Sequence, residues 1–95
     1  MGAFVAKQPN GLYCRFSSVV DTITDYNMTE KDYIKLCQAR YGEESGEKEA
    51  KDVLKNYLRP FSEVLESFVP NNESVENFSM RLKEMGYINE FKFNE

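Results

Sequence analysis

The stretch KQPNGLYCRF, residues 7–16, decides how the N-terminal part of the chain folds. Asn10 and Gly11 stand between two apolar runs, which is typical of a tight hairpin, and a two-residue loop there would pair Pro9 directly with Leu12. Proline has no N–H to donate in that pair. We therefore predict a three-residue loop, in which a type I turn with Pro9 at its second position is followed by Gly11 as a left-handed G1 bulge.

This loop fixes the register of the two strands. It pairs Gln8 with Leu12, and the pairs continue outward as far as Phe4 with Phe16. One face of the hairpin is then apolar and the other is mixed, as expected when one face is buried and the other meets solvent. The apolar face carries Phe4, Ala6, Leu12, Cys14 and Phe16, and the mixed face carries Val5, Lys7, Tyr13 and Arg15.

A lone hairpin is marginally stable in water, so a third strand is expected. The segment YINEFKF, residues 87–93, is a candidate, because Tyr87, Phe91 and Phe93 would lie on one side of it. The stretch SVVDTI, residues 18–23, either extends the sheet or ends it. The polar residues that follow it are interpreted as a connection leading into a helix.

Helical signals dominate the rest of the chain. Thr29 with Asp32 three residues later predicts a capped helix that ends at GEESG, residues 42–46. Apolar residues at helical spacing predict a second helix from about Glu47. Pro60 should end or bend it, although the apolar spacing continues in register to Val69.

Two arrangements fit that pattern: two closely apposed helices that share one buried face, which we favour, or one long helix bent at the proline.

A last helix is predicted over about 73–85, capped by Asn72 or Ser74 and ended by Gly86. The fold class is therefore α+β, in a single domain spanning 1–95. An N-terminal β-hairpin, or a three-stranded antiparallel sheet completed by the C-terminal segment, packs on three or four helices.

Composition narrows the classes of function. The 95 residues carry a formal net charge of −4 and no histidine, which removes the commonest general base and the commonest neutral metal ligand. Cys14 and Cys37 lie too far apart to form a zinc motif, and we expect both to be buried and reduced. We expect no enzyme activity, no cofactor and no metal. Without a secretion signal or a membrane-spanning stretch, a cytoplasmic location is expected.

Two surfaces are candidates for binding. On the mixed hairpin face, Lys7, Tyr13 and Arg15 combine basic and aromatic groups that could hold single-stranded nucleic acid. The second surface is acidic and helical, and it could dock on a basic partner; its residues are Glu43, Glu44, Glu47, Glu49 and Asp52, with Glu63 and Glu66 beyond. Lysines interrupt this acidic surface. For both surfaces an ordinary solvated face is the favoured interpretation, and a binding site is the alternative.

The run AKQPNGLYCRFS at 6–17, with YNMTE at 26–30 and YLRPFSEV at 57–64, resembles a group of short proteins encoded by phages and prophages of Gram-positive bacteria. The resemblance covers most of the chain. It implies an intracellular protein made in a bacterial host, and it carries over no functional residues.

The leading hypothesis is a non-enzymatic module that binds an unidentified protein partner, such as a host or defence component. The alternatives are a single-stranded nucleic-acid-binding protein that uses the hairpin face, and a structural protein that self-associates as a homodimer. No membrane partner is expected.

Overall fold

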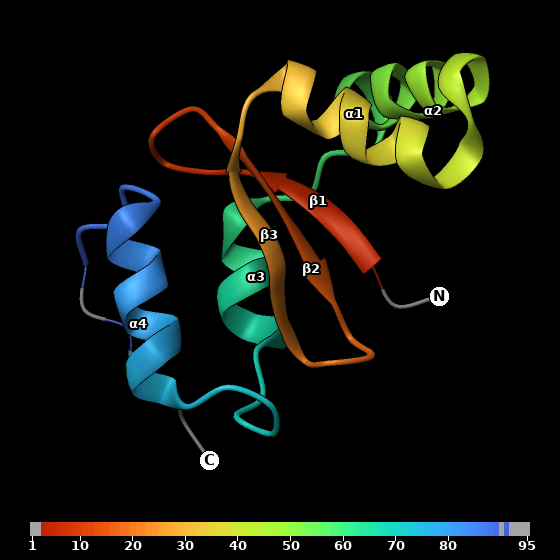
Figure 1. The fold of residues 1–95 in the computed structure, drawn as a ribbon. Coiled ribbons are helices and arrows are strands. Elements are labelled where there is room, and N and C mark those ends of the chain that lie inside the picture. Colours follow the sequence, from red (N-terminus) through yellow and green to blue (C-terminus); the bar gives the residue numbers. More distant parts are fainter. Residues whose placement is uncertain (1–2, 90, 92–95) are drawn as a thin grey trace.

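The computed structural model describes residues 3–89 and 91, and in this part of the chain the fold is α+β (Figure 1). A three-stranded antiparallel sheet has the order β1-β2-β3. Four helices follow the sheet in the described residues. The strands are β1 (Ala3–Lys7), β2 (Tyr13–Ser17) and β3 (Thr22–Met28), and the helices are α1 (Glu30–Tyr41), α2 (Glu43–Asn56), α3 (Phe61–Ser67) and α4 (Val75–Glu84).

The predicted hairpin is confirmed in its loop and in its register. Gly11 has a φ of 89°, and its N–H donates to the Gln8 carbonyl at 3.0 Å. The Gln8 N–H donates to the Leu12 carbonyl at 2.7 Å, and Phe4 pairs with Phe16. The left-handed conformation is what a G1 bulge requires, so local turn chemistry alone sets this register.

The third strand is β3, and the expectation that the C-terminal segment supplies it is wrong for the residues that the structure describes. Residues 87–89 and 91 are not in a strand, and residues 90, 92 and 93 lie outside the described residues. The segment interpreted as a polar connection instead pairs with β2 from Thr22 to Met28. Asp21, at a φ of 57°, forms the turn into it, although this backbone region favours glycine.

The β3 strand is irregular, which explains why its sequence lacks a clean alternation. Asn27 has a φ of 56°, and the pairing with β2 shifts register between Tyr13 and Phe16. A side-chain network holds this irregularity: Gln8 Oε1 accepts from the Asn27 N–H at 2.7 Å, and Gln8 Nε2 donates to Asn27 Oδ1 at 2.8 Å. Gln8 is only 3 % exposed, so its amide is buried but hydrogen-bonded.

The capped start of α1 is confirmed. The Thr29 hydroxyl accepts from the Asp32 N–H, and the Asp32 carboxylate accepts from the Thr29 N–H, both at 3.1 Å. The GEESG stretch does not separate the helices as predicted, since Gly42 alone breaks the chain and α2 begins at Glu43. Gly46 then lies inside α2 and is buried, because α1 passes so close that only a hydrogen fits there: an added Cβ would lie 2.3 Å from Gln38 Cα.

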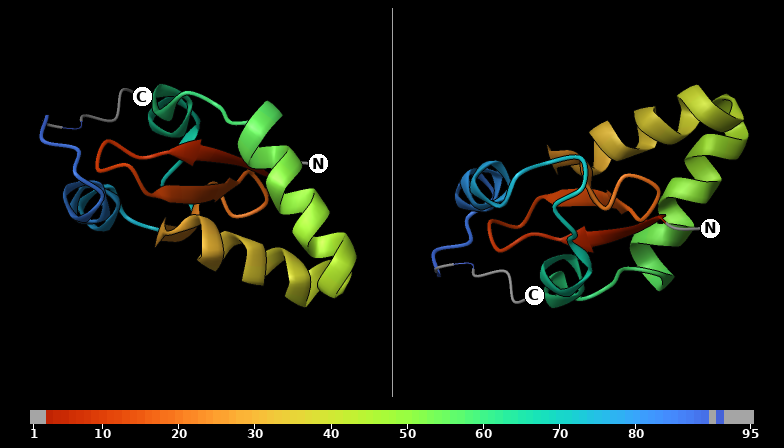
Figure 2. Two further views of the ribbon diagram at one scale, coloured as in Figure 1. Left: turned by 90° about the horizontal axis from the view of Figure 1, so that it is seen from above. Right: turned by 90° about the horizontal axis from the view of Figure 1, so that it is seen from below.

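Two helices do meet at Pro60, as favoured, but the prediction that they share one buried face is wrong. After Asn56 the chain leaves the helix, and the Arg59 N–H donates to the Val5 carbonyl at 2.9 Å. The chain thereby passes the edge of β1 and crosses from one side of the sheet to the other. Figure 2 shows α1 and α3 on opposite sides of the strands.

The side that carries α3 and α4, here called the closed face, holds the larger core. Strand residues Cys14 and Phe16 meet Val64 of α3, Phe68 directly after it and Phe78 of α4, all at most 1 % exposed. The Phe68 and Phe78 rings stack at a centroid distance of 3.9 Å. Burying rings of this size contributes roughly 1.5–3 kcal/mol each by transfer from water, so this face supplies much of the stability.

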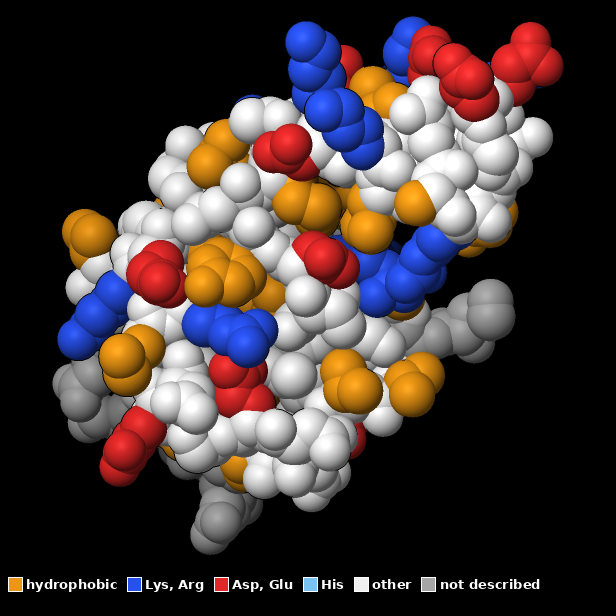
Figure 3. Space-filling model, in the orientation of Figure 1, with side chains coloured by type: hydrophobic (Ala, Val, Ile, Leu, Met, Phe, Trp, Pro, Cys, Tyr) orange, Lys and Arg blue, Asp and Glu red, His pale blue; other side chains and the backbone are white. Residues whose placement is uncertain are grey.

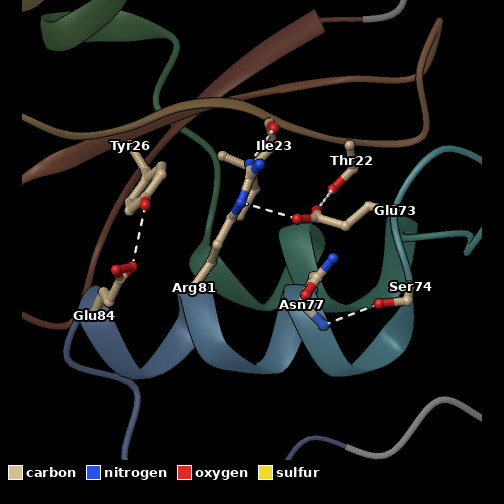
Figure 4. Close-up of polar contacts among 8 residues, drawn as sticks. All are labelled: Thr22, Ile23, Tyr26, Glu73, Ser74, Asn77, Arg81 and Glu84. Carbon is tan, nitrogen blue, oxygen red and sulfur yellow. Dashed lines mark hydrogen bonds and ion pairs between the residues drawn. The ribbon is translucent and has the colours of Figure 1, made fainter.

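Polar contacts fix α4 against β3 (Figure 4). Ser74 caps the helix by accepting from the Asn77 N–H, which decides between the two predicted caps. The buried Glu73 carboxylate bridges Arg81 Nε at 2.9 Å and accepts from the Thr22 hydroxyl. Arg81 also donates to the Ile23 carbonyl at 2.9 Å. Each charge in this group has a partner, as a partly buried ion pair requires.

Candidate binding cleft

The other side of the sheet, here called the open face, is covered only in part by α1 and α2. At their inner ends these helices meet the sheet through Val5 and Met28, which pack with Tyr33, Cys37 and Ala50. Beyond that contact the helix pair stands away from the strands. A cleft of ≈ 1020 Å³ remains between them and also reaches Phe4 and Ser67 near the edge of β1. Its volume is at the upper end of the range for binding pockets in proteins.

The floor of the cleft is apolar. Val5 and Tyr33 are 4 % and 6 % exposed, and the partly buried side chains of Leu36, Val53 and Leu58 also line it. Burial, followed by a hydrogen bond with the Cys37 thiol, raises the pKa of the Tyr33 hydroxyl above its ordinary value. The floor therefore carries no charge of its own near neutral pH.

Large apolar side chains are also exposed at this cleft. Val19, Tyr41 and Tyr57 line it and are 83 %, 56 % and 63 % exposed. Tyr41 is the last residue of α1 and Tyr57 directly follows α2, so the cleft joins residues that are separated in sequence. Exposed apolar groups that gather around one hollow mark an interaction surface more often than scattered ones do.

Arginines supply the charge of the cleft. Arg15, Arg40 and Arg59 line it, together with one carboxylate, Glu49. Figure 3 shows basic side chains beside hydrophobic ones in the hollow below the α1–α2 pair, while acidic side chains gather at the outer end of the pair. The cleft thus has the opposite sign of charge from the molecule as a whole.

The structure places the predicted hairpin site differently from expectation. Val5 is buried, and Tyr13 is half-buried against the cluster formed with α1 and α2, so the mixed face is not the open, solvated surface that was predicted. Lys7 is exposed on the edge strand. Arg15 lines the cleft and donates to the Thr24 hydroxyl at 3.0 Å. The three residues do not form one exposed patch.

The predicted acidic surface is exposed but divided. Consecutive helix positions turn by about 100°, so Glu47 and Glu49 project in nearly opposite directions. Glu47 bridges Lys51 at 3.0 Å, whereas Glu49 lines the cleft. Asp52 accepts from the Asn56 amide at 2.8 Å. Glu43 and Glu44 lie in the first turn of α2, so the structure spreads these carboxylates around the helix.

Sequence reasoning missed the residues that matter most at the cleft. Arg40 and Tyr41 lie near the end of the predicted helix that begins after Thr29, where nothing in the sequence marked them as binding residues, and both are exposed. Arg59 and Tyr57 belong to the short segment that crosses the edge of β1. The apolar spacing had placed both of them in the predicted second helix. No local sequence signal marks these positions, because the cleft exists only where the helix pair departs from the sheet.

The described residues contain no group of three or more His, Cys, Asp or Glu side chains able to hold a metal ion. Within those residues, too, no helix is long and apolar enough to cross a membrane. Comparison of the chain with protein-family models, with curated proteins and with solved structures finds no match. The arrangement of the cleft therefore carries the functional argument.

Proposed function

We propose that the protein is a non-enzymatic interaction module and that its partner, another protein, docks in the cleft between the sheet and the α1–α2 pair. The observation that carries this proposal is the combination of an apolar floor with exposed Tyr41 and Tyr57 at one hollow. Aromatic and arginine side chains of this kind are enriched at the centres of protein interfaces.

The biological setting is part of the proposal. The resemblance of residues 6–17, 26–30 and 57–64 to phage and prophage proteins supports a bacterial host as the place of action. The module would then be an accessory protein that binds a host or defence component in the cytoplasm.

Site-specific crosslinking tests the proposal. A photoreactive phenylalanine analogue replaces Tyr57 in one variant and Met80 in the other, and each is irradiated in a lysate of a Gram-positive bacterium. The two positions are matched, because they are 63 % and 64 % exposed and only Tyr57 lines the cleft. We expect one protein to crosslink from position 57 and not from position 80. Equal crosslinking from both positions would contradict the proposal.

A second candidate function, binding of single-stranded nucleic acid, is favoured by the same tyrosines beside Arg40 and Arg59. Bases stack on exposed aromatic rings, and arginines attract phosphates. The net charge of −4 weighs against it, since the rest of the surface would repel a phosphate chain. Crosslinking of position 57 to RNA or DNA instead of protein would decide for this alternative, and crosslinking to a second copy would indicate a homodimer.

A further inference from the structure

The charge of the cleft has the opposite sign to that of the chain. Three arginines and one glutamate give its lining a formal charge of +2, whereas the whole chain carries −4. A basic hollow in an acidic protein favours a partner segment that carries carboxylates. The positive charge of the cleft lining repels basic segments, although the acidic exterior of the molecule attracts them.

The guanidinium groups have donors to spare. Within the described residues Arg40 has no hydrogen-bond or ion-pair partner. Arg15 uses one nitrogen, Nη1, on Thr24, and Arg59 holds Glu63 through Nε at 3.4 Å. A guanidinium has five N–H donors in a planar fork that suits a carboxylate. Each of the three arginines can therefore donate to a carboxylate, and Arg15 and Arg59 can do so without losing their present contacts.

The floor adds a second requirement. The floor is aliphatic, and its residues are Val5, Leu36, Val53 and Leu58. Burial against them is favourable only for the apolar groups of a partner. A nucleic-acid strand offers phosphates but no aliphatic side chain. A second copy of this chain offers carboxylates at the α1–α2 turn, but the apolar side chain beside them is Tyr41, which already lines the cleft of its own molecule.

We infer that the cleft binds a peptide segment of another protein in which carboxylates flank one or more large apolar side chains. The apolar side chains enter the hollow, and the carboxylates meet Arg40, Arg15 and Arg59. This inference rests on the proposed function and specifies the chemistry of the partner.

Selection from a library tests it without knowledge of the natural partner. The purified chain is used to select from an mRNA-displayed library of random 12-residue peptides, and one enriched peptide is then titrated by fluorescence anisotropy. We expect enrichment of Asp and Glu together with Leu, Ile, Phe or Trp. We expect Arg40→Glu to weaken binding at least tenfold, and affinity to fall between 50 and 500 mM NaCl, because charge pairs at an interface rim are screened by salt.

Lys83→Glu is the matched control, since Lys83 is an exposed cation on α4, away from the cleft. It should leave the affinity unchanged. Enriched peptides that are neutral or basic, yet lose binding when Leu36 is replaced by Glu, would overturn the carboxylate inference and leave the proposed function standing. Peptides that bind wild type, Arg40→Glu and Leu36→Glu equally would overturn both. Tighter binding of a labelled oligo(dT), lost in Arg40→Glu, would overturn both in favour of nucleic acid.

Discussion

The two faces of the sheet are built from the same three strands but are covered in different ways. On the closed face, α3 and α4 press rings against the strands until Phe16, Phe68 and Phe78 are at most 1 % exposed. On the open face, α1 and α2 pack closely on each other and meet the sheet at one end only, leaving the cleft. The closed face thus supplies much of the stability, whereas the open face leaves apolar side chains exposed at the cleft.

The largest expected effect is on the closed face. Phe78→Ala removes a ring stacked on Phe68 and leaves a cavity, so the free energy of unfolding should fall by about 3–5 kcal/mol. Urea denaturation followed by circular dichroism measures the loss. If the free energy of unfolding decreases by less than about 1 kcal/mol, the Phe68–Phe78 contact does not belong to a tightly packed core.

A smaller loss is expected where α1 crosses α2. Gly46→Ala places a Cβ 2.3 Å from Gln38 Cα, which forces the two helices apart and should cost about 1–3 kcal/mol despite alanine's better helix propensity. The same denaturation experiment measures it. Ser45→Ala, an exposed change in the same turn, is the control and should stay within about 0.5 kcal/mol. If Gly46→Ala and Ser45→Ala change the free energy of unfolding equally, α1 and α2 do not approach each other closely at Gly46.

The two cysteines report on the two faces separately. Burial raises the pKa of the Cys14 thiol on the closed face to about 12, so roughly one thiol in 10⁴ is ionised at pH 8. Cys37 is also buried, at 4 % exposed, but it lines the cleft on the open face, where a reagent reaches it without opening the closed core. We expect iodoacetamide to modify Cys37 at least tenfold faster than Cys14, as measured by peptide mass spectrometry. Labelling of Cys14 should rise as the pH approaches 12, and preferential modification of Cys14 at pH 8 would contradict the comparison.

The smallest expected effect is on the capped N-terminus of α1, a helix that covers the open face only in part. Hydrogen bonds from Thr29, first from its backbone N–H, lower the pKa of the Asp32 carboxyl below its ordinary value. A carboxyl with a lowered pKa in the folded state stabilises above its unfolded pKa, and this contribution disappears as the pH falls through the folded value. Asp32→Ala should therefore lower the thermal midpoint slightly at pH 7, with the difference fading below about pH 4. A difference that persists at pH 2 would contradict this.

These comparisons also show what the sequence could predict. The hairpin register followed from Pro9 and Gly11 because turn chemistry is local. The third strand did not, because Asn27 interrupts the alternation that identifies a strand, and the buried Gln8 that holds it is distant in sequence. The cleft could not be predicted from the sequence either. It depends on the contact at Gly46 and on the path of Arg59 along β1, and both are tertiary features.

The central claim is that the open face binds and the closed face does not. The most direct test is to titrate an enriched acidic peptide into the ¹⁵N-labelled protein and to follow amide chemical shifts. We predict that the shifts will change around Leu36, Val53 and Tyr57 and will stay constant around Phe78 and Leu82. Changes centred on α4 and the closed face, with the cleft residues unmoved, would contradict it.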